Sequence, residues 1–164
     1  MKVRMLATSA IAAAALAISV SAPAFATAPA KPSGSLTIYT HQTQRDALDL
    51  GATGTSVGDV ATGSGTVALT KGGKDVGTYV YRSETMRVTI PGGNESRLST
   101  SVHSLPGGTI MVSGLVSIQQ GTRPTTPSPQ VIVGGTGDYA GANGTATFTP
   151  GKNNNAKVTF TFTS

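Results

Sequence analysis

Apolar and polar residues alternate along most of the chain after residue 35. An alternation with a period of two is typical of β-strands that bury one face. Runs of Gly, Pro and Asn separate the alternating segments, and no segment beyond the first 26 residues has helical periodicity. The pattern predicts about eight short strands, at residues 36–41, 59–69, 76–90, 95–105, 109–119, 131–133, 145–149 and 158–163.

Short turns join most of these strands, so consecutive strands are expected to pair antiparallel. Gly72 and Gly73 between two alternating runs indicate a hairpin. The polar, glycine-rich segment 42–58 is longer, and is either an ordinary surface loop or a functional connection across a barrel end. The last strand has no proline that would protect an open edge, which favours a closed barrel over a sandwich. The predicted fold is all-β, a single eight-stranded antiparallel β-barrel, lipocalin-like in outline, over residues 35–164.

The first 26 residues have the features of a secretory signal peptide. Lys2 and Arg4 precede an apolar run that is shorter than the roughly 20 residues of a membrane span. The run ends in Ala24-Phe25-Ala26, an A-x-A cleavage site, and a flexible leader is expected at 27–34. We therefore expect a secreted, extracellular protein with no membrane contact after cleavage.

Charge and composition exclude several classes of function. The formal net charge is +5, of which Lys2 and Arg4 contribute two, and the remaining basic residues are scattered along the chain. A nucleic-acid platform needs clustered basic residues with aromatic rings between them. The chain has no cysteine, so zinc held by thiolates and cysteine catalysis are excluded. We expect no metal and no cofactor.

Candidate catalytic residues come from the strand predicted at 76–90. Its even positions include Val80, Arg82, Glu84 and Met86, so an acid and a base share the more apolar face. If that face lines the barrel, Glu84 lies in a low dielectric and acts as acid or base, with Arg82 holding an anion. The alternative is a solvent-exposed pair near a strand end.

Other candidates are weaker. Asp59, at the entrance to the second strand, is either a third catalytic residue or a turn-capping one, and the turn role is favoured. His41 and His103 lie on polar faces without a carboxylate at ligand spacing, so both are expected on the surface. The residues expected to contact a ligand are Val80, Met86, Phe148 and Phe160.

Three stretches in order along the chain carry a family resemblance. They are Asp49-Leu50-Gly51 through Gly58-Asp59, then Leu105-Pro106-Gly107-Gly108 with Gly114-Leu115-Val116, then Val133-Gly134-Gly135-Thr136-Gly137 with Tyr139, Gly141-Ala142 and Gly144. The chain resembles the allene oxide cyclase barrel superfamily and, within it, secreted bacterial proteins similar to plant dirigent proteins. The resemblance implies a barrel lumen for a small lipophilic molecule, used by relatives to steer cyclisation or coupling, without a cofactor.

Three functions remain open from the sequence. The first is an isomerase-like cyclase or dirigent-type catalyst, and the second is a non-catalytic barrel that binds a small lipophile. The third is a secreted structural or interaction domain whose lumen is filled by side chains. A homo-oligomer, a dimer or trimer, is expected as well.

Overall fold

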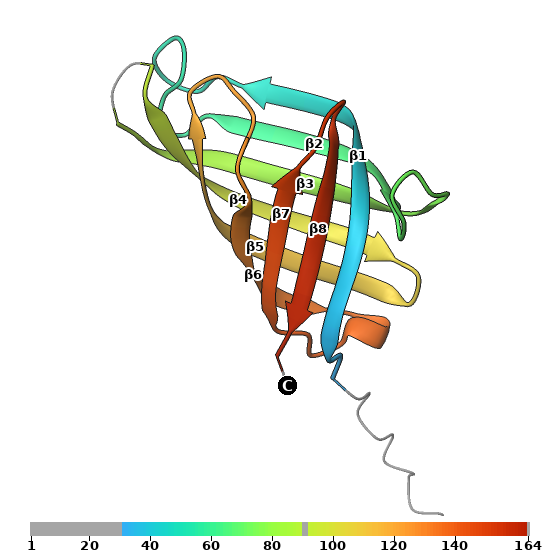
Figure 1. Ribbon diagram of the computed structural model, residues 1–164. Coiled ribbons are helices and arrows are strands. Elements are labelled where there is room, and N and C mark those ends of the chain that lie inside the picture. The colour runs from blue at the N-terminus through green and yellow to red at the C-terminus, as the bar shows by residue number, and fades with distance from the viewer. Residues whose placement is uncertain (1–30, 90–91, 164) are drawn as a thin grey trace, which may run out of the picture.

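The computed structural model describes residues 31–89 and 92–163, whose strands form one closed barrel (Figure 1). Each strand pairs antiparallel with the next, and β8 pairs with β1, so the sheet closes on itself. This confirms the predicted eight-stranded antiparallel barrel. The elements are β1 (Gly34–Leu48), β2 (Val60–Ala68), β3 (Asp75–Val88), β4 (Asn94–Leu105), β5 (Gly108–Gln119), β6 (Ser128–Gly135), the 3₁₀ helix η1 (Gly137–Tyr139), β7 (Gly144–Pro150) and β8 (Asn155–Phe162).

The signal peptide predicted at 1–26 and the first half of the leader lie outside the described residues. Among the residues that the structure does describe, no helix is long and apolar enough to cross a membrane.

β1 is longer than the sequence predicted. It continues through Leu48, although the polar segment from residue 42 indicated a connection. Its register with β2 shifts between Gln42 and Gln44, and the pairing then runs on to Leu48 opposite Val60. Most side chains of this extension are exposed, so no buried face imposes an apolar alternation there. Only the second half of the predicted connection, from residue 49, is a loop.

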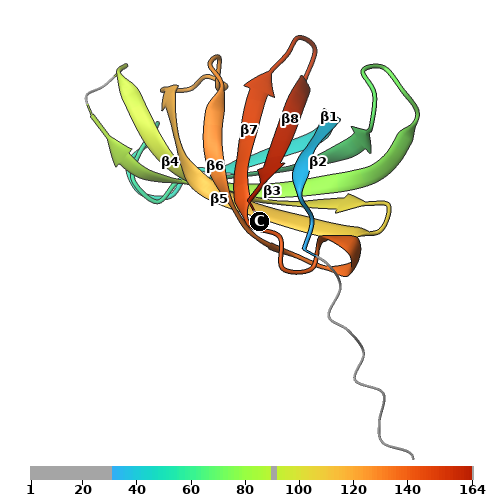
Figure 2. The ribbon, with the colours of Figure 1, turned by 60° about the horizontal axis from the view of Figure 1, so that its bottom comes forward.

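The glycine-rich corner after β6 covers one end of the barrel, at the same end as the C-terminus (Figures 1 and 2). The Asp138 amide donates to the Gly107 carbonyl at 2.8 Å, and the Thr136 amide donates to the Thr109 carbonyl at 2.9 Å. Gly137 has a φ of 60°, and a Cβ there would overlap the Gly107 carbonyl oxygen. The corner therefore rests directly on the β4–β5 turn.

The apolar core fills the barrel next to this corner. Ile38, Ile110 and Phe160 are fully buried, and Leu105 and Phe162 pack with them. Alternation puts one face of every strand inside, and Ile38 on β1, Val112 on β5, Phe148 on β7 and Phe160 on β8 lie on that face. The other half of the interior is different in composition and holds the site.

Candidate functional site

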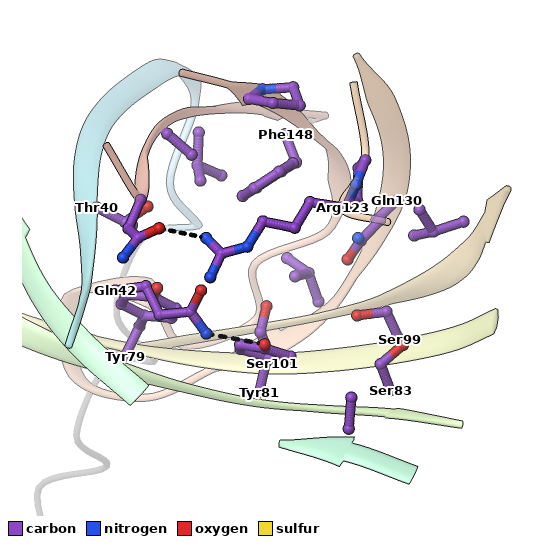
Figure 3. A pocket seen from close by; sticks show the side chains of 18 of the residues that line it. Thr40, Gln42, Tyr79, Tyr81, Ser83, Ser99, Ser101, Arg123, Gln130 and Phe148 are labelled. Atoms are coloured by element: carbon purple, nitrogen blue, oxygen red, sulfur yellow. Dashed lines mark hydrogen bonds between the residues drawn. The ribbon is translucent and has the colours of Figure 1, made fainter. Parts of the chain in front are cut away.

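A cavity of about 210 Å³ occupies the half of the barrel away from η1. The β5–β6 loop contributes Arg123 to its mouth (Figure 3). The β7–β8 hairpin contributes Asn154, which accepts a hydrogen bond from Arg123. One wall is apolar, with Val112, Val116 and Phe148. The opposite wall, from β3 and β4, presents hydroxyl, imidazole and guanidinium groups. The interior is thus neither packed shut nor purely apolar.

The expected placement of Arg82 and Glu84 inside the barrel is wrong. Their side chains are 64% and 41% exposed, and they pair with each other at 3.2 Å on the outer surface. Val80 and Met86, expected to contact a ligand, are 54% and 48% exposed on the same face. The catalytic interpretation of Arg82 and Glu84 rested on their lining the lumen, so it is dropped.

The opposite face of β3 lines the cavity with Tyr79, Tyr81 and Ser83. The two tyrosines lie opposite Gly65 and Gly63 of β2, and a Cβ on either glycine would stand within 3 Å of a tyrosine Cε1. Glycine on β2 therefore makes room for large rings on β3. This cross-strand pairing of glycine with tyrosine is a sequence signal that identifies the inner face.

His103 is buried, contrary to the surface position expected from the sequence, whereas His41 is exposed as expected. The His103 ring stacks on Tyr79 at 5.8 Å between centroids and meets Phe160 edge-on at 5.4 Å. Burial lowers the pKa of His103 to about 4, so the imidazole is neutral at pH 7. Its Nε2 lies 3.1 Å from the Ser101 hydroxyl, which also lines the cavity.

A second acid–base pair lies inside the barrel, on the same face of β4 as His103. Glu95 is 1% exposed and binds the Arg97 guanidinium at 2.9 Å. The Thr85 hydroxyl donates to the same carboxylate at 3.2 Å. Arg97 lines the cavity, whereas Glu95 lies behind it. The described strands therefore hold two Arg–Glu pairs at the same spacing, one inside the barrel and one outside.

Tyr79 and Tyr81 are held by polar residues near the mouth. The side-chain amide of Gln42 donates to the Tyr81 hydroxyl at 2.9 Å, as Figure 3 shows. Burial raises the pKa of Tyr79 to about 12, against the opposing effects of the Arg123 charge and a hydrogen bond with Thr40. The Tyr79 phenol is therefore a neutral donor at physiological pH.

Three buried polar atoms on cavity residues have no hydrogen-bond partner in the described part of the chain: Arg97 Nε, His103 Nδ1 and Gln130 Oε1. An unsatisfied buried polar group costs about 1–3 kcal/mol, so such groups call for a partner. Arg97 Nε can therefore donate a hydrogen bond to a bound molecule, and Gln130 Oε1 can accept one. His103 Nδ1 can do either, depending on which ring nitrogen carries the proton.

Asp59 has the turn-capping role. Its carboxylate accepts from the Ser56 amide at 2.7 Å, the Leu50 amide at 2.9 Å and the Ser56 hydroxyl at 3.0 Å. The backbone bonds from Ser56 and Leu50 lower the pKa of Asp59. With these contacts Asp59 orders the β1–β2 loop.

Of the other two residues predicted to contact a ligand, Phe148 and Phe160, only the first lines the cavity. Phe160 lies in the core and reaches the site through His103. Within residues 31–89 and 92–163, no three His, Cys, Asp or Glu side chains gather as metal ligands. The chemistry available is proton transfer by a neutral imidazole and stabilisation of an oxyanion by guanidinium and phenol groups.

Comparisons with solved structures place this barrel among proteins of known fold. A pyocyanin demethylase matches with 25% identity and a TM-score of 0.66, over 79% of this chain and 99% of that one. The Diels-Alderase AbmU from Streptomyces koyangensis matches with 17% identity and a TM-score of 0.60, over 79% and 68%. The pterocarpan synthase dirigent protein GePTS1 matches with 14% identity and a TM-score of 0.50, over 77% and 84%.

A search of curated proteins finds no match. The family described as "Allene oxide cyclase barrel like domain" matches residues 36–160, which span all eight strands. The resemblance carried by the glycine motifs is thereby confirmed, and the chain belongs to the allene oxide cyclase barrel-like family.

Proposed function

We propose that this protein binds a small, largely apolar molecule in the barrel cavity and steers its cyclisation or coupling. The observation that carries the proposal is the two-sided cavity, with an apolar wall on β5 and β7 and a polar wall on β3 and β4. An apolar site with a few convergent polar groups is the usual form of a small-molecule site. The structures similar to this one are named for Diels-Alder, dirigent and demethylase functions.

The proposed catalytic role needs no cofactor. His103 is neutral and accepts or donates a proton, while Arg97 and Tyr79 supply hydrogen bonds to an oxygen that gains charge. A fixed cavity also orients the reacting atoms, which by itself lowers the barrier to ring closure. A cyclisation in this cavity would be isomerase-like, since it moves bonds within one molecule.

Isothermal titration calorimetry with naphthalene-2-carboxamide, a neutral two-ring probe, tests the binding site. We expect the parent to bind the probe and Ser101→Leu to bind it at least tenfold more weakly, because Ser101 lines the cavity. Thr100→Leu is the matched control, since Thr100 is the adjacent residue on the opposite face of β4. If the parent does not bind the probe, or both variants bind as the parent does, the proposed site is wrong and the structural alternative is favoured.

We also propose that the protein forms a homo-oligomer through the outer face of β3–β6. Eight large apolar side chains are exposed on these strands: Val76, Val80, Met86, Leu98, Met111, Leu115, Val131 and Val133. Leu98 and Leu115 are direct cross-strand neighbours. Large exposed apolar patches mark interaction sites. Light scattering should give a multimer for the parent, a monomer for Leu115→Arg and a multimer for the control Thr161→Arg on β8. A monomeric parent would contradict the proposal.

Export remains a proposal as well. Cleavage after Ala26 gives a mature chain that begins at Thr27 and is found in the medium. Mass spectrometry of the culture supernatant should detect that N-terminus, and a full-length product retained by the cells would exclude it.

A further inference from the structure

The cavity lining carries positive charge without an acid. Arg45, Arg97 and Arg123 line it, and no Asp or Glu is among the lining residues. The charge of Arg97 is offset by Glu95 behind it. Arg45 and Arg123 form no ion pair with any residue in the described ranges. The mouth of the cavity therefore has an uncompensated positive charge.

Arg123 is placed to contact a bound molecule. Its Nη1 donates to Asn154 Oδ1 at 2.6 Å, which links the β5–β6 loop to the β7–β8 hairpin across the mouth. Figure 3 shows its side chain reaching over the lumen toward Thr40 and Gln42. A guanidinium has five N–H donors, so this single bond leaves several free to bind an oxyanion.

The hairpin that holds Arg123 is itself fixed. Asn153 and Asn154 have φ values of 55° and 62°, in the left-handed region where Asn is tolerated better than most residues. The backbone amide of Gln42 donates to the Asn154 carbonyl at 3.0 Å, so the hairpin is anchored to β1. Asn154 thus orients Arg123 from a defined position.

The cavity beneath Arg123 has an apolar wall and is limited in size. Phe148, Val112, Val116 and Pro124 line it, and its volume is about 210 Å³. A cavity of about 150 Å³ accommodates one benzene ring, so this one suits a body of one to two rings. A molecule that fills it with its oxygen at the mouth meets the guanidinium directly.

We propose that the natural ligand is an organic carboxylate with an apolar body of one to two rings, and that Arg123 binds its carboxylate at the mouth. This inference rests on the proposed function and specifies the ligand class of the same cavity. Arg45 adds attraction from the rim, and the unpartnered Arg97 Nε is a further donor deeper in the cavity. A charged hydrogen bond of this kind raises affinity about tenfold or more.

The experiment compares two probes of equal shape, naphthalene-2-carboxylate and naphthalene-2-carboxamide, by calorimetry at pH 7. We expect the parent to bind the carboxylate at least tenfold more tightly than the carboxamide. Arg123→Gln should remove most of that preference and leave the carboxamide affinity within about twofold. Arg123 lies in an exposed loop, so the variant should fold. Arg82→Gln, on the outer surface, is the matched control and should keep the preference.

The outcomes separate this inference from the proposed function. Equal binding of both probes by the parent overturns the carboxylate inference and leaves the cavity as a neutral small-molecule site. If Arg123→Gln still prefers the carboxylate over the carboxamide, Arg123 does not bind the carboxylate. The same comparison of the two probes in Arg45→Gln then shows whether Arg45 at the rim causes the preference. Failure of the parent to bind either probe overturns the proposed function together with this inference.

Discussion

The ring of Tyr79 lies against Gly65 on the neighbouring strand. The two residues are direct partners of β3 and β2, and Tyr79 Cε1 is 2.8 Å from the place where a Cβ of residue 65 would stand. The glycine gives the ring room between two strands, so the small residue on β2 determines where the polar wall of the cavity stands.

The first prediction is that Gly65→Ala destabilises the barrel by about 1–3 kcal/mol, because the added methyl group meets the Tyr79 ring, Gln42 Cα and the His41 carbonyl. Urea denaturation should show the loss, and affinity for naphthalene-2-carboxamide should fall with it. Gly72→Ala is the control, since its φ is 70° and no atom stands near the added Cβ, so it should cost about 1 kcal/mol. Unchanged stability of Gly65→Ala would mean that Tyr79 is not held against β2.

The second prediction compares the two Arg–Glu pairs. Glu95→Ala leaves the mostly buried Arg97 without its partner and should cost about 3–5 kcal/mol. Glu84→Ala removes a pair exposed on both sides and should cost less than about 1 kcal/mol. Both are read from urea denaturation at pH 7. Equal losses would contradict the buried position of Glu95.

Replacing both Glu95 and Arg97 separates two causes of the expected loss of stability, the unpaired charge of Arg97 and the lost packing of the Glu95 side chain. Glu95→Met with Arg97→Met should be clearly more stable than Glu95→Ala, because no uncompensated charge remains in the barrel. A double variant as unstable as the single one would point to lost packing rather than to the unpaired guanidinium.

The sequence was sufficient to predict the fold because alternation, turn residues and the glycine corner agree. Strands such as β8 have one clearly apolar face, Val158, Phe160 and Phe162, and that face is inside. The same rule failed for β3, where both faces carry large side chains. The inner face has Tyr79 and Tyr81, and the outer face has Val80 and Met86.

The failure has a physical cause that also explains His103. Hydrophobicity identifies the inside of a barrel only when the interior is apolar, and here half of the interior is a cavity with a polar wall on β3 and β4. The row Arg97, Ser99, Ser101 and His103 has the composition of a solvent-exposed face, yet it lines the lumen. The outside of the barrel has exposed apolar residues instead, such as Leu98 on β4 and Leu115 on β5. Glycine opposite tyrosine was the available signal, because it depends on space and not on polarity.

The third prediction concerns the glycine corner. Gly137→Ala should destabilise most strongly, because a positive φ and overlap with the Gly107 carbonyl act together. Gly135→Ala should follow, since its Cβ would stand 2.6 Å from the Thr109 carbonyl oxygen. Gly134→Ala, with open space around the added carbon, should cost least. Thermal melts of the three variants test the order, and equal melting temperatures would contradict this account of the corner.

The last prediction is a loss of stability in acid that depends on His103. Its pKa is about 4 in the folded barrel against an ordinary value of 6.5, so between these values the unfolded chain binds a proton that the folded chain excludes. Stability should therefore be complete above about pH 6.5 and decline as the pH falls toward 4, by on the order of 3 kcal/mol in total. His103→Phe keeps a ring against Tyr79 and Phe160 but cannot titrate, so it should lose much less stability over the same range. Urea denaturation at pH 7.0, 5.5 and 4.5 gives both curves; the lowered pKa of Asp59 affects the parent and the variant alike and cancels in the comparison. If the two proteins lose stability in parallel, His103 is accessible to protons in the folded state and its neutral, buried role in the cavity is wrong.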